Sequence, residues 1–135
     1  MSAAADAFFD TNIILYLISN EPQKADRAEA LVASGGTVSI QVLNEFVSVA
    51  TRKHALDMRG IRDVLSTLRT VCRVMPMDLE MHDLALDFVE RYRFGIYDAL
   101  IVAAALRAGC TVLYSEDLQS GRTIDRLTIR NPFTA

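Results

Sequence analysis

The stretch "AFFDTNIILYL", residues 7–17, sets an aspartate between two apolar runs. Apolar residues occupy positions 7–9 before Asp10, and isoleucines and leucines follow it from position 13 onward. These neighbours predict burial, and a buried carboxylate costs on the order of several kcal/mol unless it is paired, hydrogen-bonded or bound to a metal. Asp10 therefore needs a partner, and the identity of that partner is the first question that the sequence raises.

The composition is that of a globular protein. The chain has 135 residues, of which 51% are hydrophobic and 23% charged, so we expect one domain spanning residues 1–135. Its two cysteines, Cys72 and Cys110, are too distant for a CxxC pair and indicate a reducing, cytoplasmic environment. No basic segment precedes the first apolar run, and no stretch reaches roughly 18 uncharged apolar residues. We therefore expect neither a signal peptide nor a membrane span.

The chain is slightly acidic, and its basic residues are unevenly distributed. A net charge of −3 and a pI of about 5.3 exclude the overall basic character that is typical of nucleic-acid-binding proteins. All of the 14 basic residues except Lys24 and Lys53 are arginines. A dense basic set in the middle of the chain comprises Arg52, Lys53, Arg59, Arg62, Arg69 and Arg73. A guanidinium suits phosphate, but arginine is also an ordinary surface cation in a GC-rich genome, and both alternatives stay open.

Hydrophobic periodicity predicts alternating strands and helices. Short β-rich runs are expected at residues 7–10, 37–40, 72–76 and 111–115, with a possible fifth strand at the edge over 127–131. Helices are expected over residues 12–18, 22–34, 42–52, 57–71, 78–92 and 97–108, with Asp78 as an N-cap. This order predicts an α/β fold with a mostly parallel central sheet of four to five strands and helices on both faces. In such a fold, ligands bind beyond the carboxyl ends of the strands, where the strand order switches direction.

Four acidic residues fall where that edge of the sheet should be. Asp10 closes the first strand, and Asp117 follows two residues after the fourth. Asp98 opens the apolar helix "DALIVAAALRA", and Glu45 lies in the first half of the helix that follows the second strand. These placements predict that the four carboxylates lie close together.

Three of these acids also have ordinary structural explanations. Asp98 could interact with the dipole of the helix that it opens, and Asp117 could stabilise a turn through its own backbone. A solvated helix face explains Glu45 equally well, and its members would be Gln41, Glu45, Ser48 and Arg52. An ordinary structural explanation is poorest for Asp10, because a carboxylate between apolar segments needs a partner.

A divalent cation would relieve the repulsion among four carboxylates at one edge of a sheet. Oxygen ligands without cysteine or histidine favour hard ions such as Mg²⁺ or Mn²⁺. The two histidines, His54 and His82, have no second ligand at a zinc-like spacing, so we expect them at the surface. With one or two ions bound, an acidic site can accept a phosphodiester and activate water against it.

The segments "FFDTNIILYL", "VLNEF", "YDALIVAAAL" and "LYSEDL" resemble, in this order, the four motifs of the PIN-domain family, as in the VapC-type toxins of bacterial toxin–antitoxin pairs. The resemblance runs through nearly the whole chain. It implies a metal-dependent endoribonuclease whose catalytic and metal-binding quartet consists of Asp10, Glu45, Asp98 and Asp117. Asn12 and Ser115 match the polar residues that support these acids.

The same resemblance implies partners. It suggests a homodimer and an antitoxin whose tail occupies the acidic groove, with an apolar part of that groove offered by residues 12–18 and 22–34. Glu116 departs from the family pattern, because this position is often basic or polar; it would either weaken the approach of RNA or face solvent.

Other classes fit the sequence less well. Haloacid-dehalogenase-like phosphatases need a second acid where this chain has Asn12, and receiver domains need a late lysine, whereas Lys24 and Lys53 are early. Neither GxxxxGK[ST] nor GxSxG occurs. A non-catalytic binding module is the remaining alternative, and the complete quartet argues against it. The RNA itself is not identified, because no RNA-reading module is recognisable.

Overall fold

A six-stranded sheet forms the centre of the computed structural model, which describes residues 6–54 and 56–134. The strand order is β3-β2-β1-β4-β6-β5, and every neighbouring pair is parallel except β5 and β6. The strands are β1 (Ala7–Phe9), β2 (Gly36–Ser39), β3 (Cys72–Met75), β4 (Val112–Tyr114), β5 (Thr123–Ile124) and β6 (Leu127–Arg130).

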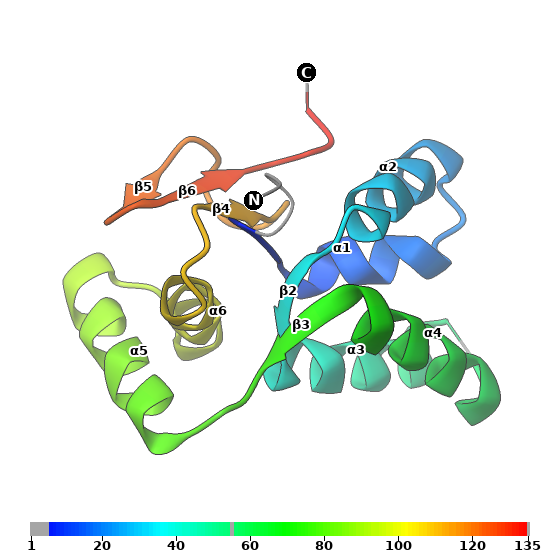
Figure 1. Ribbon diagram of the computed structural model, residues 1–135, viewed down its shortest axis with the longest axis horizontal. Coiled ribbons are helices and arrows are strands. Elements are labelled where there is room, and N and C mark those ends of the chain that lie inside the picture. Colours follow the sequence, from blue (N-terminus) through cyan, green and yellow to red (C-terminus); the bar gives the residue numbers. More distant parts are fainter. Residues whose placement is uncertain (1–5, 55, 135) are drawn as a thin grey trace.

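Helices cover both faces of this sheet. They are α1 (Thr11–Leu15), the 3₁₀ helix η2 (Tyr16–Ile18), α2 (Pro22–Ala33), α3 (Ile40–Lys53), α4 (Met58–Val71), α5 (Leu79–Tyr92) and α6 (Ile96–Arg107). Figure 1 shows α5 and α6 on one side of the sheet and α1 to α4 on the other. The predicted α/β fold is confirmed, and β6 is the expected fifth strand. The additional strand, β5, was not predicted, because its two residues are too few to show a periodicity.

Helix ends follow local signals in the sequence. The Asp78 carboxylate accepts a hydrogen bond of 2.8 Å from the Met81 amide, as expected of an N-cap. Pro22 occupies the first turn of α2, where its missing N–H costs nothing. Ser39 closes β2 and caps α3 by accepting a hydrogen bond from the Val42 amide. Because this cap lies directly at the strand end, α3 begins at the carboxyl edge of the sheet.

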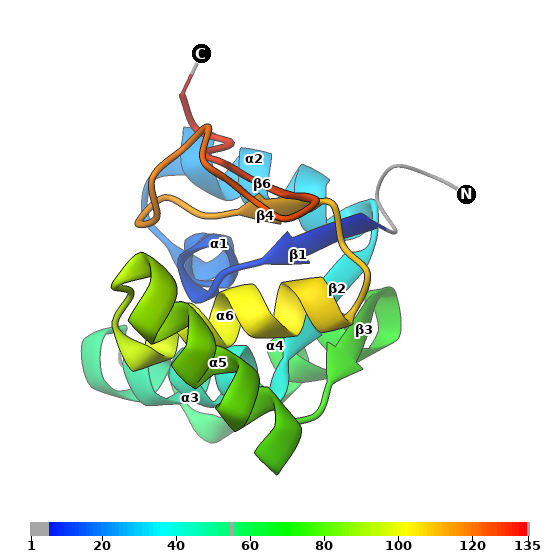
Figure 2. The ribbon, with the colours of Figure 1, turned by 90° about the vertical axis from the view of Figure 1, so that its left-hand side faces the viewer.

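The strand order switches direction between β1 and β4. From β1 the chain proceeds through β2 to β3 on one side and then crosses to β4 on the other. The Asp10 amide donates a 3.0 Å hydrogen bond to the Tyr114 carbonyl, so the β1–β4 ladder continues one residue past β1. Figure 2 shows α6 lying across the sheet below β1, and its chain then returns into β4. The first turn of α6 therefore lies near the carboxyl ends of the strands.

The core that fixes this arrangement is built from both layers of helices. Phe8 and Phe9 are fully buried in the sheet, and the apolar side chains of α6 are buried from Ala99 to Ala105. At Gly36 an added Cβ would lie 2.6 Å from the Phe9 ring, so glycine lets β2 approach β1. No helix among residues 6–54 and 56–134 is long and apolar enough to cross a membrane.

Candidate active site

Asp10 lies at the switch point between β1 and β4. Its side chain is only 7% exposed, and it acts as the N-cap of α1. One carboxylate oxygen accepts a 2.7 Å hydrogen bond from the Thr11 amide, and the other accepts a 2.7 Å bond from the Ser115 hydroxyl. Two hydrogen bonds thus provide part of the compensation that a buried carboxylate needs.

This compensation is incomplete. Burial raises the pKa of Asp10 to about 6, although the hydrogen bonds from Ser115 and Thr11 lower it, and the negative charges of Asp117 and Asp98 raise it further. No Lys, Arg or His forms an ion pair with Asp10 in the described part of the chain. A nearby cation would favour the ionised form of this carboxylate.

Ser115 connects Asp10 to Asp117. Its fully buried hydroxyl donates to Asp10 and accepts bonds from the amides of Asp117, at 3.2 Å, and Leu118, at 3.1 Å. Asn12 holds the Asp117 side chain with a 2.9 Å amide-to-carboxylate bond and accepts a hydrogen bond from the Glu116 amide. The two predicted supporting residues therefore fix the backbone turn after β4 and the carboxylate that it carries.

Glu45 is held by different partners. One of its oxygens accepts a 2.6 Å bond from the Gln41 amide nitrogen, and the other accepts a 3.3 Å bond from the Thr11 hydroxyl. The Gln41 nitrogen also donates to the Tyr97 carbonyl at 3.2 Å. Since Tyr97 precedes Asp98, the Gln41 amide joins Glu45 on α3 to the first turn of α6.

Asp98 occupies that first turn and is exposed at the edge of the sheet. Partial burial of its carboxyl raises its pKa, and the negative charges of Asp117 and Glu45 raise it further. Asp98 is thus coupled electrostatically to Asp10, Asp117 and Glu45. The structure brings the four predicted acids together, and their part in catalysis or metal binding remains a prediction.

Gln41 departs from the solvated helix face that was one explanation for its stripe. It is 8% exposed, and its amide oxygen is buried without a partner among the described residues. Both neighbours of its nitrogen are acceptors, which fixes the orientation of the amide. A glutamine four residues before a glutamate on one helix is the signal that could have indicated this contact.

Glu116 neither faces solvent freely nor approaches the other acids as an unpaired charge. Its carboxylate accepts hydrogen bonds from the Tyr16 hydroxyl and from Lys24, whose ammonium lies 2.6 Å away. These partners lower the pKa of Glu116 against the effect of its partial burial. The Lys24 ammonium also lies 4.7 Å from the centre of the Tyr16 ring. Glu116 therefore anchors the turn after β4 to α2.

The described residues do not include a closed metal site: no three histidine, cysteine or acidic side chains are already grouped around one point. The donor chemistry nevertheless fits a hard divalent cation, because the four acids offer only oxygen and repel one another. His54 and His82 are both exposed, as expected. Asp10, Glu45, Asp98 and Asp117 are the residues that could hold the ion.

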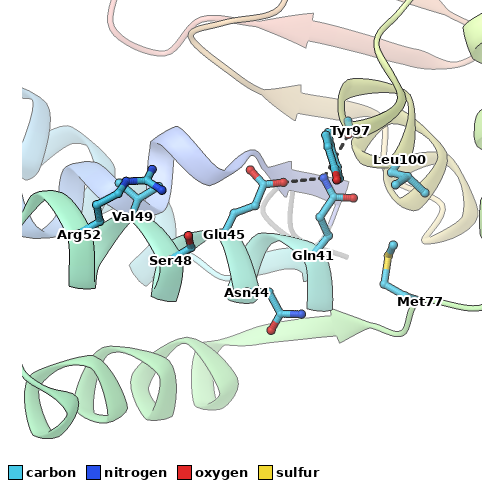
Figure 3. A pocket seen from close by; sticks show the side chains of 9 residues that line it. All are labelled: Gln41, Asn44, Glu45, Ser48, Val49, Arg52, Met77, Tyr97 and Leu100. Carbon is cyan, nitrogen blue, oxygen red and sulfur yellow. Dashed lines mark hydrogen bonds between the residues drawn. The ribbon is translucent and has the colours of Figure 1, made fainter.

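A cavity of about 570 Å³ adjoins this site along α3 (Figure 3). Glu45 forms part of its wall, together with polar residues of α3 and with Tyr97 and Leu100 of α6. The basic residues in the middle of the chain do not all lie at this cavity. Arg52 lines it, whereas Arg62 and Arg69 line a second cavity on α4.

A family model described as the PIN domain matches residues 7–124. The chain belongs to the PIN-domain family. The family suggested by the four motifs is therefore confirmed. No curated protein matches the chain as a relative.

The chain is similar in fold to solved structures that include a toxin and a toxin–antitoxin complex. A toxin–antitoxin complex from Klebsiella pneumoniae is similar with a TM-score of 0.73 at 21% identity, covering 96% of this chain and 99% of that chain. VapC20 of Mycobacterium tuberculosis, a sarcin–ricin loop cleaving toxin, gives 0.67 at 22% identity over 82% and 89% of the two chains. VapBC2 from Rickettsia felis, bound to a DNA fragment from its promoter, gives 0.65 at 19% identity over 93% and 97%.

Proposed function

We propose that this PIN domain is a metal-dependent endoribonuclease and the toxin of a type II toxin–antitoxin pair. The observation that carries the proposal is the convergence of Asp10, Glu45, Asp98 and Asp117 at the switch point of the sheet, without an ion-pairing cation in the described part of the chain. Acidic sites of this kind bind phosphodiesters only when a metal reverses their charge. Similarity in fold to toxins and toxin–antitoxin complexes supports the assignment.

Mg²⁺ or Mn²⁺, held by these four carboxylates, would supply a Lewis acid for the phosphate and lower the pKa of water for attack. The residues of the chain provide the geometry. Ser115 and the Thr11 amide fix both oxygens of Asp10, and Asn12 fixes Asp117. Rigid placement of ligands is the main contribution that a protein makes to such a site.

Cleavage of mixed cellular RNA by the purified protein tests this proposal. We expect cleavage with added Mg²⁺ or Mn²⁺ and none with excess chelator. Ca²⁺ should inhibit, because its bonds to oxygen are longer and its coordination geometry is looser. Full activity in excess chelator would contradict the metal mechanism, and a lack of cleavage under every metal condition would favour a non-catalytic binding module. Sequencing the 5′ ends of RNAs cut during brief induction would then identify the substrate.

The proposed antitoxin would make two kinds of contact. A cavity of about 430 Å³ between α2 and α4 has apolar walls that include Val32, Val64, Leu68 and Val71, and it offers a place for an apolar helix. The quartet offers carboxylates to an arginine of the antitoxin tail, which can bind them in bidentate fashion. The helix contact should be insensitive to salt, and the arginine contact should weaken as salt rises.

A variant in the tail of the co-expressed antitoxin distinguishes the contribution of the arginine contact from that of the helix contact. Replacing the tail arginine by alanine should restore part of the ribonuclease activity while the complex stays intact on size-exclusion chromatography. A complex that keeps full activity with its tail unchanged would contradict inhibition by occupation of the site.

We also infer a homodimer that acts in the cytoplasm. Leu79 is 74% exposed and Leu86 is 46% exposed, and both lie on α5, seven residues apart. An exposed apolar helix face of this kind is suited to contact a second copy. Light scattering after size-exclusion chromatography should give the mass of a dimer, which Leu79→Glu should reduce to that of a monomer.

A further inference from the structure

One face of α3 carries more than its acidic residue. Gln41, Glu45, Ser48 and Arg52 follow one another at spacings of four, three and four residues, which places them on the same side of the helix. Figure 3 shows them in succession along α3, with Arg52 at the far end from Gln41. This face of α3 therefore extends from the candidate active site along the cavity and ends at the positively charged Arg52 side chain.

The opposite wall of this cavity is apolar and aromatic. It is formed by Met77, Tyr97 and Leu100. Tyr97 is 68% exposed and directly precedes Asp98, although its carbonyl is tied to Gln41. A large aromatic ring that remains in solvent beside a reactive centre is available for stacking with a ligand.

Arg52 supplies positive charge near the acidic site. It is exposed, and none of the ion pairs formed by the described residues includes it, whereas Lys24 and Arg107 are both paired with carboxylates. Arg52 lies seven residues after Glu45, which corresponds to about 10 Å along a helix. A phosphate close to Glu45 would therefore leave a flanking phosphate of the same strand within reach of the Arg52 guanidinium.

We propose that this cavity binds an unpaired nucleotide of the RNA substrate next to the scissile phosphate, with its base against the Tyr97 ring and a flanking phosphate on Arg52. The inference rests on the proposed ribonuclease function and extends it to a substrate class. A base must be unstacked from its neighbours before it can lie on a tyrosine ring, so a single-stranded segment fits and a regular duplex does not. The Arg52 guanidinium would offset the repulsion between the acidic residues and the incoming strand.

Binding of a randomised, fluorescein-labelled 20-nucleotide RNA, followed by fluorescence anisotropy in Ca²⁺, tests the subsite. Ca²⁺ should neutralise the carboxylates without supporting cleavage. We expect Tyr97→Ala to weaken binding about tenfold and Tyr97→Phe to retain it, since phenylalanine keeps the ring face. Arg52→Ala should weaken binding severalfold and lower the salt dependence by about one phosphate contact, in contrast to Arg62→Ala on α4, which should bind as wild type. An unlabelled duplex should compete poorly.

Cleavage kinetics with Mg²⁺ separate the subsite from the function itself. Tyr97→Ala should raise KM with little change in kcat. The subsite is wrong if wild type cleaves RNA and Tyr97→Ala and Arg52→Ala match it in affinity and KM. A dimer that dissociates in Tyr97→Ala, with unchanged RNA affinity, would likewise overturn the proposal and assign this wall to an interface between copies. Failure of wild type to cleave RNA with any metal would instead overturn the ribonuclease function on which the subsite rests.

Discussion

The candidate active site has two halves that are held in different ways. Asp10 directly follows β1 and Asp117 lies in the turn after β4, and the buried Ser115 hydroxyl links the first carboxylate to the backbone of the second. Glu45 and Asp98 instead lie on α3 and α6, and the Gln41 amide connects Glu45 to the residue before Asp98. The strand half is buried at Asp10, whereas the helix half borders a cavity that is open to solvent.

Together the two halves make the site both rigid and accessible. Burial raises the pKa of Asp10 to about 6, which means that the ionised carboxylate is unfavourable in the strand half. A nearby cation would stabilise this ionised form. In the helix half, Glu45 is also held by two hydrogen bonds, but it is less buried than Asp10 and lines the cavity that we assign to the substrate. Substitutions in the strand half should therefore affect catalysis most, and those in the helix half should be milder.

Asp10→Asn should have the largest effect. Asparagine keeps the volume and one acceptor but removes the charge that would hold a cation, so we expect RNA cleavage to fall at least roughly 10²-fold with the fold intact. Initial rates of cleavage of cellular RNA, measured on preparations free of contaminating ribonuclease, check the loss of activity. Circular dichroism spectra check that the fold is intact. Turnover close to that of wild type would contradict a metal site at Asp10.

Ser115→Ala should be intermediate. It removes the donor to Asp10 and the acceptor of the Asp117 and Leu118 amides, and losses from such supporting residues are typically about 10- to 100-fold. Measuring the cleavage kinetics of Ser115→Ala and Asp117→Asn side by side ranks the two residues. Complete loss in both variants would mean that Ser115 belongs to the reacting centre, and unchanged activity would reduce it to a structural turn residue.

Gln41→Met should have a smaller effect, of about tenfold on activity, because Glu45 keeps its bond from Thr11. Methionine preserves length. It loses the hydrogen bonds to Glu45 and Tyr97 but also removes the unpaired amide oxygen, and these opposing effects should leave the melting temperature little changed. Gln23→Met, at an exposed position of α2, is the matched control and should behave as wild type. Equal activity in both variants would show that orientation of Glu45 by Gln41 does not contribute.

A separate effect, on stability and not on activity, is expected without metal. The pKa of Asp10 is about 6 in the folded protein and 3.8 in its unperturbed state, so the stability present below pH 3.8 is lost as pH rises through 6. In chelator at pH 7.5, Asp10→Asn should therefore be more stable than wild type by about 1–3 kcal/mol. Urea unfolding at pH 7.5 and pH 4 measures this, and the advantage should shrink at the lower pH. A variant less stable than wild type at pH 7.5 would contradict an unfavourable buried charge.

Much of this arrangement could be predicted from local sequence. Periodicity located five strands and the helices, and the burial of Asp10 indicated that it needed a partner. The partners themselves could not be read, because Asp10 and Ser115 are 105 residues apart and meet only through the β1–β4 pairing. The non-local partners of Gln41 and Glu116 could not be read for the same reason. Their surroundings are set by α6 and by Lys24, contacts that no local pattern encodes.

Mn²⁺ binding to the metal-free protein, followed by electron paramagnetic resonance, tests most directly whether the four carboxylates form one cation site. We predict that Asp10→Asn and Asp98→Asn, one from each half, both weaken Mn²⁺ binding at least about tenfold. Asp87→Asn, which removes an exposed carboxylate of α5 away from the site, should bind as wild type. Equal Mn²⁺ affinity in wild type and in both quartet variants would contradict a shared metal site at the edge of the sheet.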